Sequence, residues 1–150
     1  MNRTPAPSSQ KNLTVSDLAT LLRTLEPVLN SGVYVYAQVP LERDIANIDT
    51  IATVREREGI TLILREEEAQ RHALPVLFRA AWITLTVHSD LQAFGLTAAF
   101  SRALADAGIG CNVIAGANHD HVFVPVQHAQ RALETLRALQ AAAVQNPSGI

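Results

Sequence analysis

Three of the five histidines in the sequence stand where they could share a metal ion. His119 and His121 are two positions apart, so on a β-strand both side chains would point to the same face of a sheet. His88 follows an alternating apolar segment and would end a second strand. Because imidazole nitrogens bind zinc and similar ions, these three side chains form a candidate metal site. No cysteine or carboxylate with typical ligand spacing joins them. The other interpretation is that His119, Asp120 and His121 hold a turn between two strands.

Two further polar residues, Ser89 and Asp90, follow His88 directly. Neighbouring residues on a strand point to opposite faces, whereas the members of a hydrolytic triad are assembled in space. The sequence therefore predicts no catalytic residue here. Asp90 precedes a helical segment, where a carboxylate either caps the helix or binds an ammonium group. Gly95 likewise either allows close packing of a helix against a strand or lets a ligand approach the backbone.

The elements that must position these residues form a β-α-β-β-α pattern in the second half of the chain. Apolar and polar residues alternate up to Val87, which predicts a strand, and Leu96, Phe100 and Ala107 recur at helical spacing. The predicted elements are a strand at 83–87, a helix at 96–107, strands at 111–115 and 121–126, and a helix at 129–139. A full unit of this type has a fourth strand. We therefore expect a strand from the first half, or from a second copy, to cover the sheet edge beside residues 121–126.

The first half opens on leucines that recur at helical spacing, namely Leu18, Leu21, Leu22, Leu25 and Leu29. Pro27 is expected to end or kink the helix that they predict. The pattern that follows predicts strands at 33–39, 50–55 and 60–64, and then a short acidic helix at 66–72. Residues 41–49 are polar and predict no defined element.

Composition and charge exclude several classes of function. The chain has 12 basic and 14 acidic residues and no cluster of Lys and Arg, so we expect no nucleic-acid partner. Its apolar runs are too short to span a membrane, and no secretory signal is visible, so no membrane partner is expected. The single cysteine, Cys111, suits a reducing compartment, which indicates a cytoplasmic protein. No nucleotide-binding glycine motif is present, and we expect no cofactor.

The segments 87–99, 104–109, 112–116 and 119–125 resemble the strands and helix of an ACT domain. Together with residues 55–62, the pattern is similar to small bacterial proteins made of two ACT-like units, and it covers about residues 13–140. The resemblance implies an α+β fold of two ferredoxin-like βαββαβ units, with mostly antiparallel sheets and helices on one face. The expected parts are a flexible tail at 1–11, units at 12–78 and 79–142, and a second flexible tail at 143–150.

The resemblance also implies a function. ACT domains commonly pair side by side and bind amino acids where the first strand meets the first helix, against a strand of the neighbouring unit. Carried over by position, the expected ligand-binding residues are Ser89, Asp90, Leu91, Phe94, Gly95, Asn112, Val113 and Ile114. The expectation is a non-catalytic regulatory module that forms a homodimer through a sheet edge or a helix face. Two alternatives are an assembly protein with a vestigial pocket and a histidine-based, metal-dependent enzyme.

Overall fold

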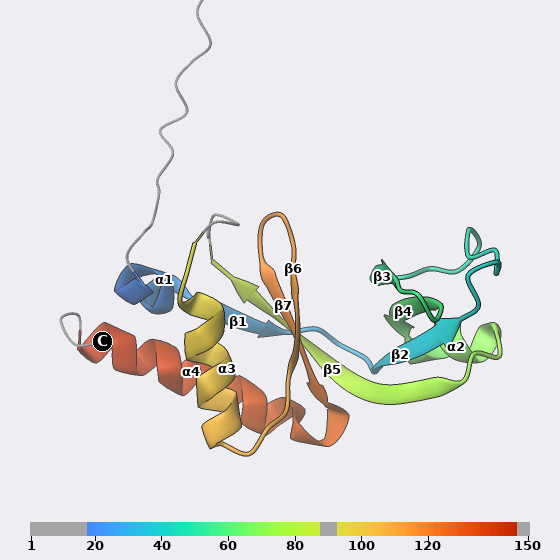
Figure 1. Cartoon of the computed structure of the whole chain (residues 1–150). Helices are drawn as coiled ribbons and strands as arrows, with labels where there is room; N and C mark the ends of the chain where they lie inside the picture. Colours follow the sequence, from blue (N-terminus) through green and yellow to red (C-terminus); the bar gives the residue numbers. More distant parts are fainter. Residues whose placement is uncertain (1–17, 88–92, 147–150) are drawn as a thin grey trace, which may run out of the picture.

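The structure is a computed structural model, which describes residues 18–87 and 93–146. A seven-stranded, entirely antiparallel sheet runs through it, in the order β3-β4-β2-β5-β7-β6, with β1 paired to β5 (Figure 1). The strands are β1 (Glu26–Leu29), β2 (Tyr34–Val39), β3 (Ala52–Arg55), β4 (Ile60–Arg65), β5 (Val76–Thr86), β6 (Asn112–Ala115) and β7 (Asp120–Pro125). The helices are α1 (Leu18–Thr24), α2 (Glu66–Arg71), α3 (Leu96–Asp106) and α4 (Ala129–Gln145), with a 3-10 turn, η1, at Val126–His128. Across the described ranges, none of the helices has the length and apolar character needed to cross a membrane.

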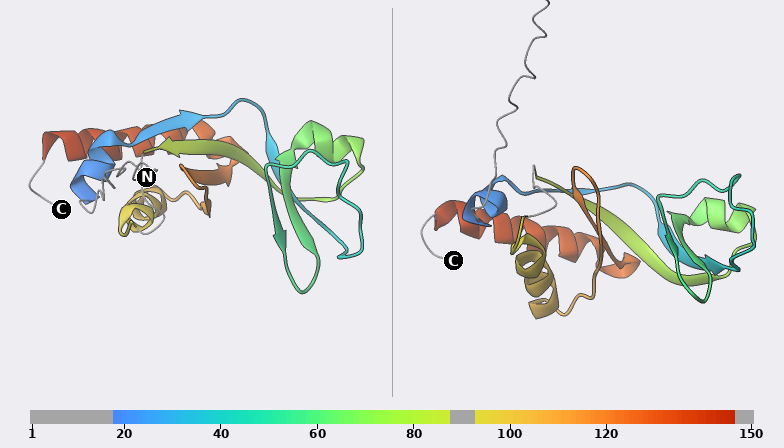
Figure 2. Two further views of the ribbon diagram at one scale, coloured as in Figure 1. Left: turned by 90° about the horizontal axis from the view of Figure 1, so that it is seen from above. Right: turned by 45° about the horizontal axis from the view of Figure 1, so that its top comes forward.

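The eleven-residue strand β5 belongs to two units at once. Its first part pairs with β2, where Ala80 lies opposite Tyr34, and its second part pairs with β7 and β1. The N-terminal unit is β2-β3-β4-α2-β5, and the C-terminal unit is β5-α3-β6-β7-α4 with β1 added. Each has the strand order of a ferredoxin-like fold, as expected. The proposed boundary at residues 78 and 79 therefore falls inside a continuous strand, and α2 and α4 lie towards opposite ends of an elongated molecule (Figure 2).

Strand β1 takes the place of the fourth strand of the C-terminal unit. It pairs with β5, with Pro27 opposite Leu85, so a strand from the first half does cover the open edge. The location that we expected for that edge was wrong, because β7 lies between β5 and β6 and both of its sides are paired. The edge that needs a fourth strand belongs to β5, on the side away from β7, and β1 pairs there.

The expected helix through Leu29 is also wrong at its C-terminal end. The helix α1 ends at Thr24, and Leu29 belongs to β1. Pro27 explains the change, because proline lacks a backbone N–H and is tolerated in an edge strand but not in a helix interior. Helix α1 packs on α4, where the side-chain amide of Gln140 donates to the carbonyl oxygen of Arg23 at 3.3 Å. At the other end of the chain α4 continues to Gln145, so residues 143–145 are helical rather than part of a tail.

All the helices pack on one face of the sheet, as β5 makes clear. Ala81, Ile83 and Leu85 are buried against α1, α3 and α4, and Arg79, on the same face, pairs with Glu66 of α2. Residues of even number, such as Ala80 and Trp82, point to the opposite face, where no helix of the described chain packs. There they join an aromatic cluster that crosses both units. Its members are Tyr34, Tyr36, Ile63, Phe78, Ala80, Trp82, Ile114 and Phe123, with Ala52 at the edge.

The first crossover of the N-terminal unit is a loop, residues 40–51, where the second unit has the helix α3. The buried carboxylate of Glu68 holds this loop by accepting the backbone N–H of Asp49 at 3.1 Å. Arg71 and His72 donate to the same carboxylate. The N–H of Asp49 and the Arg71 charge hold the pKa of Glu68 below its usual range. The loop ends at Ile51, whose N–H donates to the carbonyl oxygen of Ile63 at 2.7 Å, so it is fixed at both α2 and β4.

Candidate functional site

The junction of β5 and α3 is built around Gly95, the residue before the first turn of α3. Gly95 has φ 93° and ψ −26°, the left-handed conformation that side chains disfavour, and its carbonyl oxygen accepts the N–H of Ala99 at 2.9 Å. No side chain caps the first turn among the described residues. His88, Ser89, Asp90 and Leu91 lie outside the described residues.

Gly95 also lies against α1. A Cβ atom at this position would be 3.2 Å from Cδ2 of Leu18, closer than side chains normally approach. The structure therefore provides a packing reason for a glycine here. This close approach does not exclude a ligand, because the backbone N–H groups of the first turn lie at the end of α3 rather than along its packed side.

The strand β6 presents its predicted site residues to both faces of the sheet. Asn112 lies opposite Phe123 and Ile114 opposite His121, on the face without helices, whereas Val113 lies opposite Val122 and packs on the helical core. The side chains of β6 thus alternate between the two faces, and its outer edge presents main-chain groups. One edge of this strand pairs with β7, and the other has no strand partner within residues 18–87 and 93–146.

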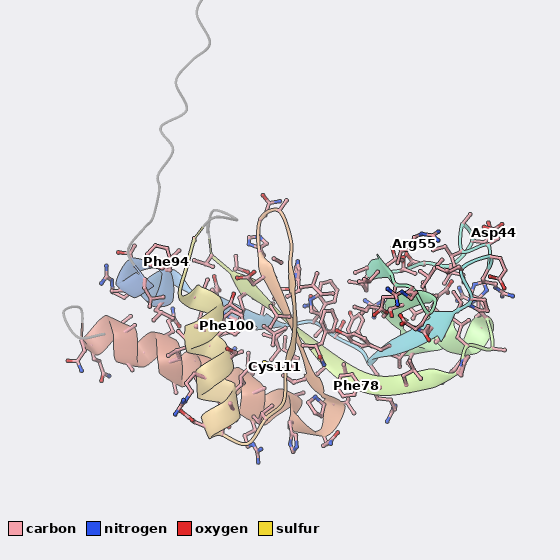
Figure 3. All side chains as sticks on the ribbon, in the orientation of Figure 1. Asp44, Arg55, Phe78, Phe94, Phe100 and Cys111 are labelled. Carbon is pink, nitrogen blue, oxygen red and sulfur yellow. The ribbon has the colours of Figure 1, made fainter. Side chains whose placement is uncertain are left out.

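Phe94 stands at the N-terminal end of α3 and is 78% exposed (Figure 3). One copy of the chain thus does not bring all of the described site residues together. Phe94 and Gly95 are at the helix end, and the side chains of Asn112 and Ile114 are on the opposite face of the sheet.

Two histidines of the predicted metal site, His119 and His121, lie in the described part of the chain, and His88 does not. His121 Nδ1 accepts the indole N–H of Trp82 at 3.1 Å and lies 3.3 Å from the hydroxyl oxygen of Thr84. Burial, with His119 nearby, lowers the pKa of His121, which keeps the ring neutral and able to accept this bond. In the described part of the chain, no group of three His, Cys, Asp or Glu side chains is placed to hold a metal ion.

A cleft between the two units is a feature that sequence reasoning missed. It has a volume of about 200 Å³ and is lined by Ile51, Ala52, Trp82, Ile114, His121 and Phe123. Ile51 and Ala52 come from the N-terminal unit, and the other four come from β5, β6 and β7. Part of the cleft was indicated by the sequence, because the alternation of two predicted strands places Trp82 and His121 each on the face opposite the aliphatic one. The pairing of these strands was needed to bring the two side chains together.

Cys111 and Tyr36 are residue types that can react, but burial disfavours the deprotonated form of each. Cys111 is half-buried beside the helical core, and burial raises the pKa of its thiol, so the thiolate is disfavoured. Burial also raises the pKa of Tyr36 to about 12. The Tyr36 ring packs edge-on to Phe78 and Phe123, with centroids 5.6 and 5.8 Å away, so it belongs to the aromatic cluster.

Comparison with known proteins agrees with this architecture. Residues 14–81 and residues 78–138 each match a family model of the ACT domain. A crystal structure of a Vibrio cholerae protein of unknown function, described as a possible transport protein, is 44% identical over 85% of this chain and 98% of that one, with a TM-score of 0.75. The chain belongs to the ACT-domain family. No curated protein matches it.

Two more distant structures share the fold of this ACT-domain protein. One is an Agrobacterium tumefaciens protein, 15% identical over 77% of this chain and 89% of that one, with a TM-score of 0.64. The other is the regulatory subunit of aspartate kinase from Thermus flavus, 11% identical over 75% of this chain and 95% of that one, with a TM-score of 0.61. The first family match includes α1 and β1, which pack on the C-terminal unit. The sequence boundaries of the two ACT domains are therefore not the boundaries of the two packed units.

Alanine substitutions at three glycines of this ACT-domain protein distinguish the cost of backbone strain from the cost of crowding a neighbouring side chain. Gly95→Ala is expected to cost about 1–2 kcal/mol for a left-handed backbone, and more because of Leu18. Gly108 has φ 70° and open space around its Cβ position, so Gly108→Ala should show the backbone cost alone. Gly110 has neither constraint, and Gly110→Ala should be close to neutral. Urea unfolding at unchanged m measures the series. Equal losses at Gly95 and Gly108 would contradict the packing role of Leu18.

Proposed function

We propose that this ACT-domain protein is a cytoplasmic regulatory module without catalytic activity, which binds an amino acid or a similar small zwitterion at the junction of β5 and α3. Membership of the family supports a regulatory, ligand-binding role. The observation that carries the proposed site is Gly95, which stands in a left-handed conformation where the first strand of the unit leads into its first helix. The proposed contact residues remain Ser89, Asp90, Leu91, Phe94, Gly95, Asn112, Val113 and Ile114.

The chemistry of this junction suits a zwitterion. Helix α3 has eleven residues, and the unpaired N–H groups of its first turn carry a partial positive charge that favours a carboxylate. Gly95 has no side chain to block the approach of a ligand. The carboxylate of Asp90 would then bind the ammonium group. Two opposite charges held this close also give selectivity for amino acids over simple carboxylic acids.

The other wall of the proposed site is β6 of a second copy. No strand of the described residues pairs with the outer edge of β6, and an open sheet edge is normally covered or paired. A symmetric homodimer in which each copy presents β6 to the β5–α3 junction of the other would complete two equal sites. Ligand binding would then favour one arrangement of the two copies, which is how a module without chemistry can regulate a partner.

Thermal unfolding with each common amino acid tests this proposal. Saturating ligand, at about 100 to 1,000 times its dissociation constant, is expected to stabilise the fold by about 3–4 kcal/mol. Asp90→Ala should weaken binding more than about tenfold, because a charged hydrogen bond contributes roughly 1.5–3 kcal/mol. Asp106→Ala, at the far end of α3, is the matched control and should leave binding unchanged, since the carboxylate of Asp106 pairs with exposed Arg102, away from the proposed site. If no amino acid shifts the transition of the unaltered protein, the proposal is wrong.

The second candidate is an assembly protein whose pocket no longer binds a ligand. The observation in its favour is Phe94, which leaves a large apolar ring 78% exposed at the proposed site. Under this reading the ring packs on a partner and not on a ligand. A Phe94→Ser variant that loses self-association, in a protein that no amino acid stabilises, would support it.

A further inference from the structure

The inter-unit cleft shares Ile114 with the residues proposed for the amino-acid site but is otherwise distinct from that site. It lies on the face of the sheet that no described helix covers, whereas Gly95 and α3 lie on the other face. The N-terminal unit contributes Ile51 and Ala52 to one wall. The C-terminal unit contributes the other wall through Trp82, Ile114 and Phe123. Anything bound there touches both units at once.

The lining of the cleft selects against charge. Five of its six residues are apolar or aromatic, and none is Asp, Glu, Lys or Arg. The sixth, His121, uses Nδ1 to accept the indole N–H of Trp82, and Thr84, itself bonded by the amide of Asn30, lies beside the same nitrogen. Nδ1 of His121 and the indole N–H of Trp82 are thus already bonded to each other. A buried carboxylate or ammonium group would find no charged partner in this lining, which would cost several kcal/mol.

The shape of the cleft suits a flat ring. The partly exposed ring of Trp82 stacks on the fully buried ring of Phe123, with planes inclined by only 15° and centroids 6.0 Å apart, and Ile51 and Ile114 also line the cleft. Offset stacking on such rings is favourable beyond the burial of area alone. The volume of about 200 Å³ also exceeds that of an engineered apolar cavity of about 150 Å³ that binds benzene.

We infer that this cleft is a second binding site, which takes a small uncharged aromatic molecule between the two units. The ligand stacks on Trp82, whose ring is backed by the fully buried Phe123, and contacts Ile51 and Ala52 across the cleft. Because it bridges the units, it stabilises one inclination of the N-terminal unit relative to the C-terminal unit. The β5 strand carries that inclination directly, since both units share it.

Trp82 is the single tryptophan of the chain, so its fluorescence reports on the cleft without labelling. Titration with phenol is expected to change the emission saturably, and saturation-transfer NMR of phenol should give the same affinity. Benzoate, which has a similar ring and a negative charge, should bind at least about tenfold more weakly. No saturable change with phenol in either measurement would overturn the inference, as would equal affinities for phenol and benzoate.

Two variants place the binding in the cleft. Ala52→Leu fills the wall from the N-terminal unit and is expected to weaken phenol binding at least about tenfold. Val54→Leu, on the same face of β3 but outside the lining, is the matched control and should have no effect. Ile51 is 39% exposed, so Ile51→Phe partly fills the cleft with little risk to folding and should act like Ala52→Leu. Unchanged phenol affinity in both cleft variants would overturn the inference.

The outcome is independent of the proposed amino-acid site. Ala52→Leu should leave any stabilisation by amino acids unchanged, and Asp90→Ala should leave phenol binding unchanged. Phenol affinity that falls as protein concentration rises would mean that a second copy occupies the cleft, and this too would overturn the inference.

Discussion

A truncated chain that starts at Ser31 is expected not to fold cooperatively, although it keeps strands β2 to β7 and helices α2 to α4. The truncation removes α1 and β1. Leu21, Leu22 and Leu25 are each no more than 1% exposed and belong to the core of the C-terminal unit. Burying a leucine stabilises a fold by roughly 1.5–3 kcal/mol, so the three together contribute roughly 5–9 kcal/mol. This is comparable to the whole stability of a typical domain, about 5–15 kcal/mol.

The truncation also exposes one side of β5, which in the intact chain pairs with β1 from Glu26 to Leu29. Circular dichroism and thermal unfolding measure the result, and we expect the near-ultraviolet signal and the cooperative transition to be lost. A truncated chain that melts cooperatively near the temperature of the full protein would contradict the role that we assign to β1.

A permuted chain is the control for this experiment. Residues 18–30, joined by a flexible linker after Asn146, would follow α4 as a fourth strand follows the second helix in an ordinary ferredoxin-like unit. The connection is short, because Leu22 of α1 and Asn146 line one cavity. We expect the permuted chain to recover the cooperative transition. Failure of both chains would show that chain order, and not only the presence of β1, is needed.

Replacement of Phe123 is expected to uncouple the two units. Phe123 is fully buried and packs on Tyr36 of the N-terminal unit and Trp82 of β5. Phe123→Ala should cost about 3–5 kcal/mol, as other buried phenylalanines do. Because the lost contacts join the units, hydrogen exchange should show the β2–β4 region opening at a lower free energy than α3 and α4.

Phe100→Ala is the matched control. Phe100 is also fully buried, but it lies on α3 in the core of the C-terminal unit (Figure 3). A similar loss of about 3–5 kcal/mol is expected, with hydrogen exchange lowered first in the C-terminal unit. If both variants lower protection evenly along the chain, the aromatic cluster does not link the units in the way that we propose.

Local patterns predicted most elements of this protein, and non-local pairing accounts for the errors. The alternation in 83–87 and the helical spacing of Leu96 and Phe100 are confirmed, because each depends only on which face a residue buries. The error at Leu29 has a different cause. A leucine four residues after Leu25 fits a helix, whereas Pro27 disfavours one, and pairing with the strand 83–86 makes residues 26–29 extended.

The site could be predicted only in part for the same reason. Gly95 was identified by its place between a strand and a helix, and its left-handed conformation agrees with that place. The position of Ile114 on the face away from α3 follows from the register with His121, which the sequence does not display. The inter-unit cleft could not be located from the sequence, because its walls come from strands that are distant along the chain. Ile51 and Trp82 meet only because the sheet brings β3 and β5 around one aromatic cluster.

The place of β1 has a consequence for how the protein is made. During synthesis, residues 18–30 leave the ribosome before their partners β5 and α4, and α4 ends at Gln145. The N-terminal unit, β2 to β5, can fold before α4, on which this leucine-rich segment packs, has been synthesised. Pairing of distant segments slows folding because the intervening chain must be ordered first. The last step of folding is therefore expected to be the docking of α1 and β1 on the C-terminal unit, and their apolar side chains are exposed to chaperones until then.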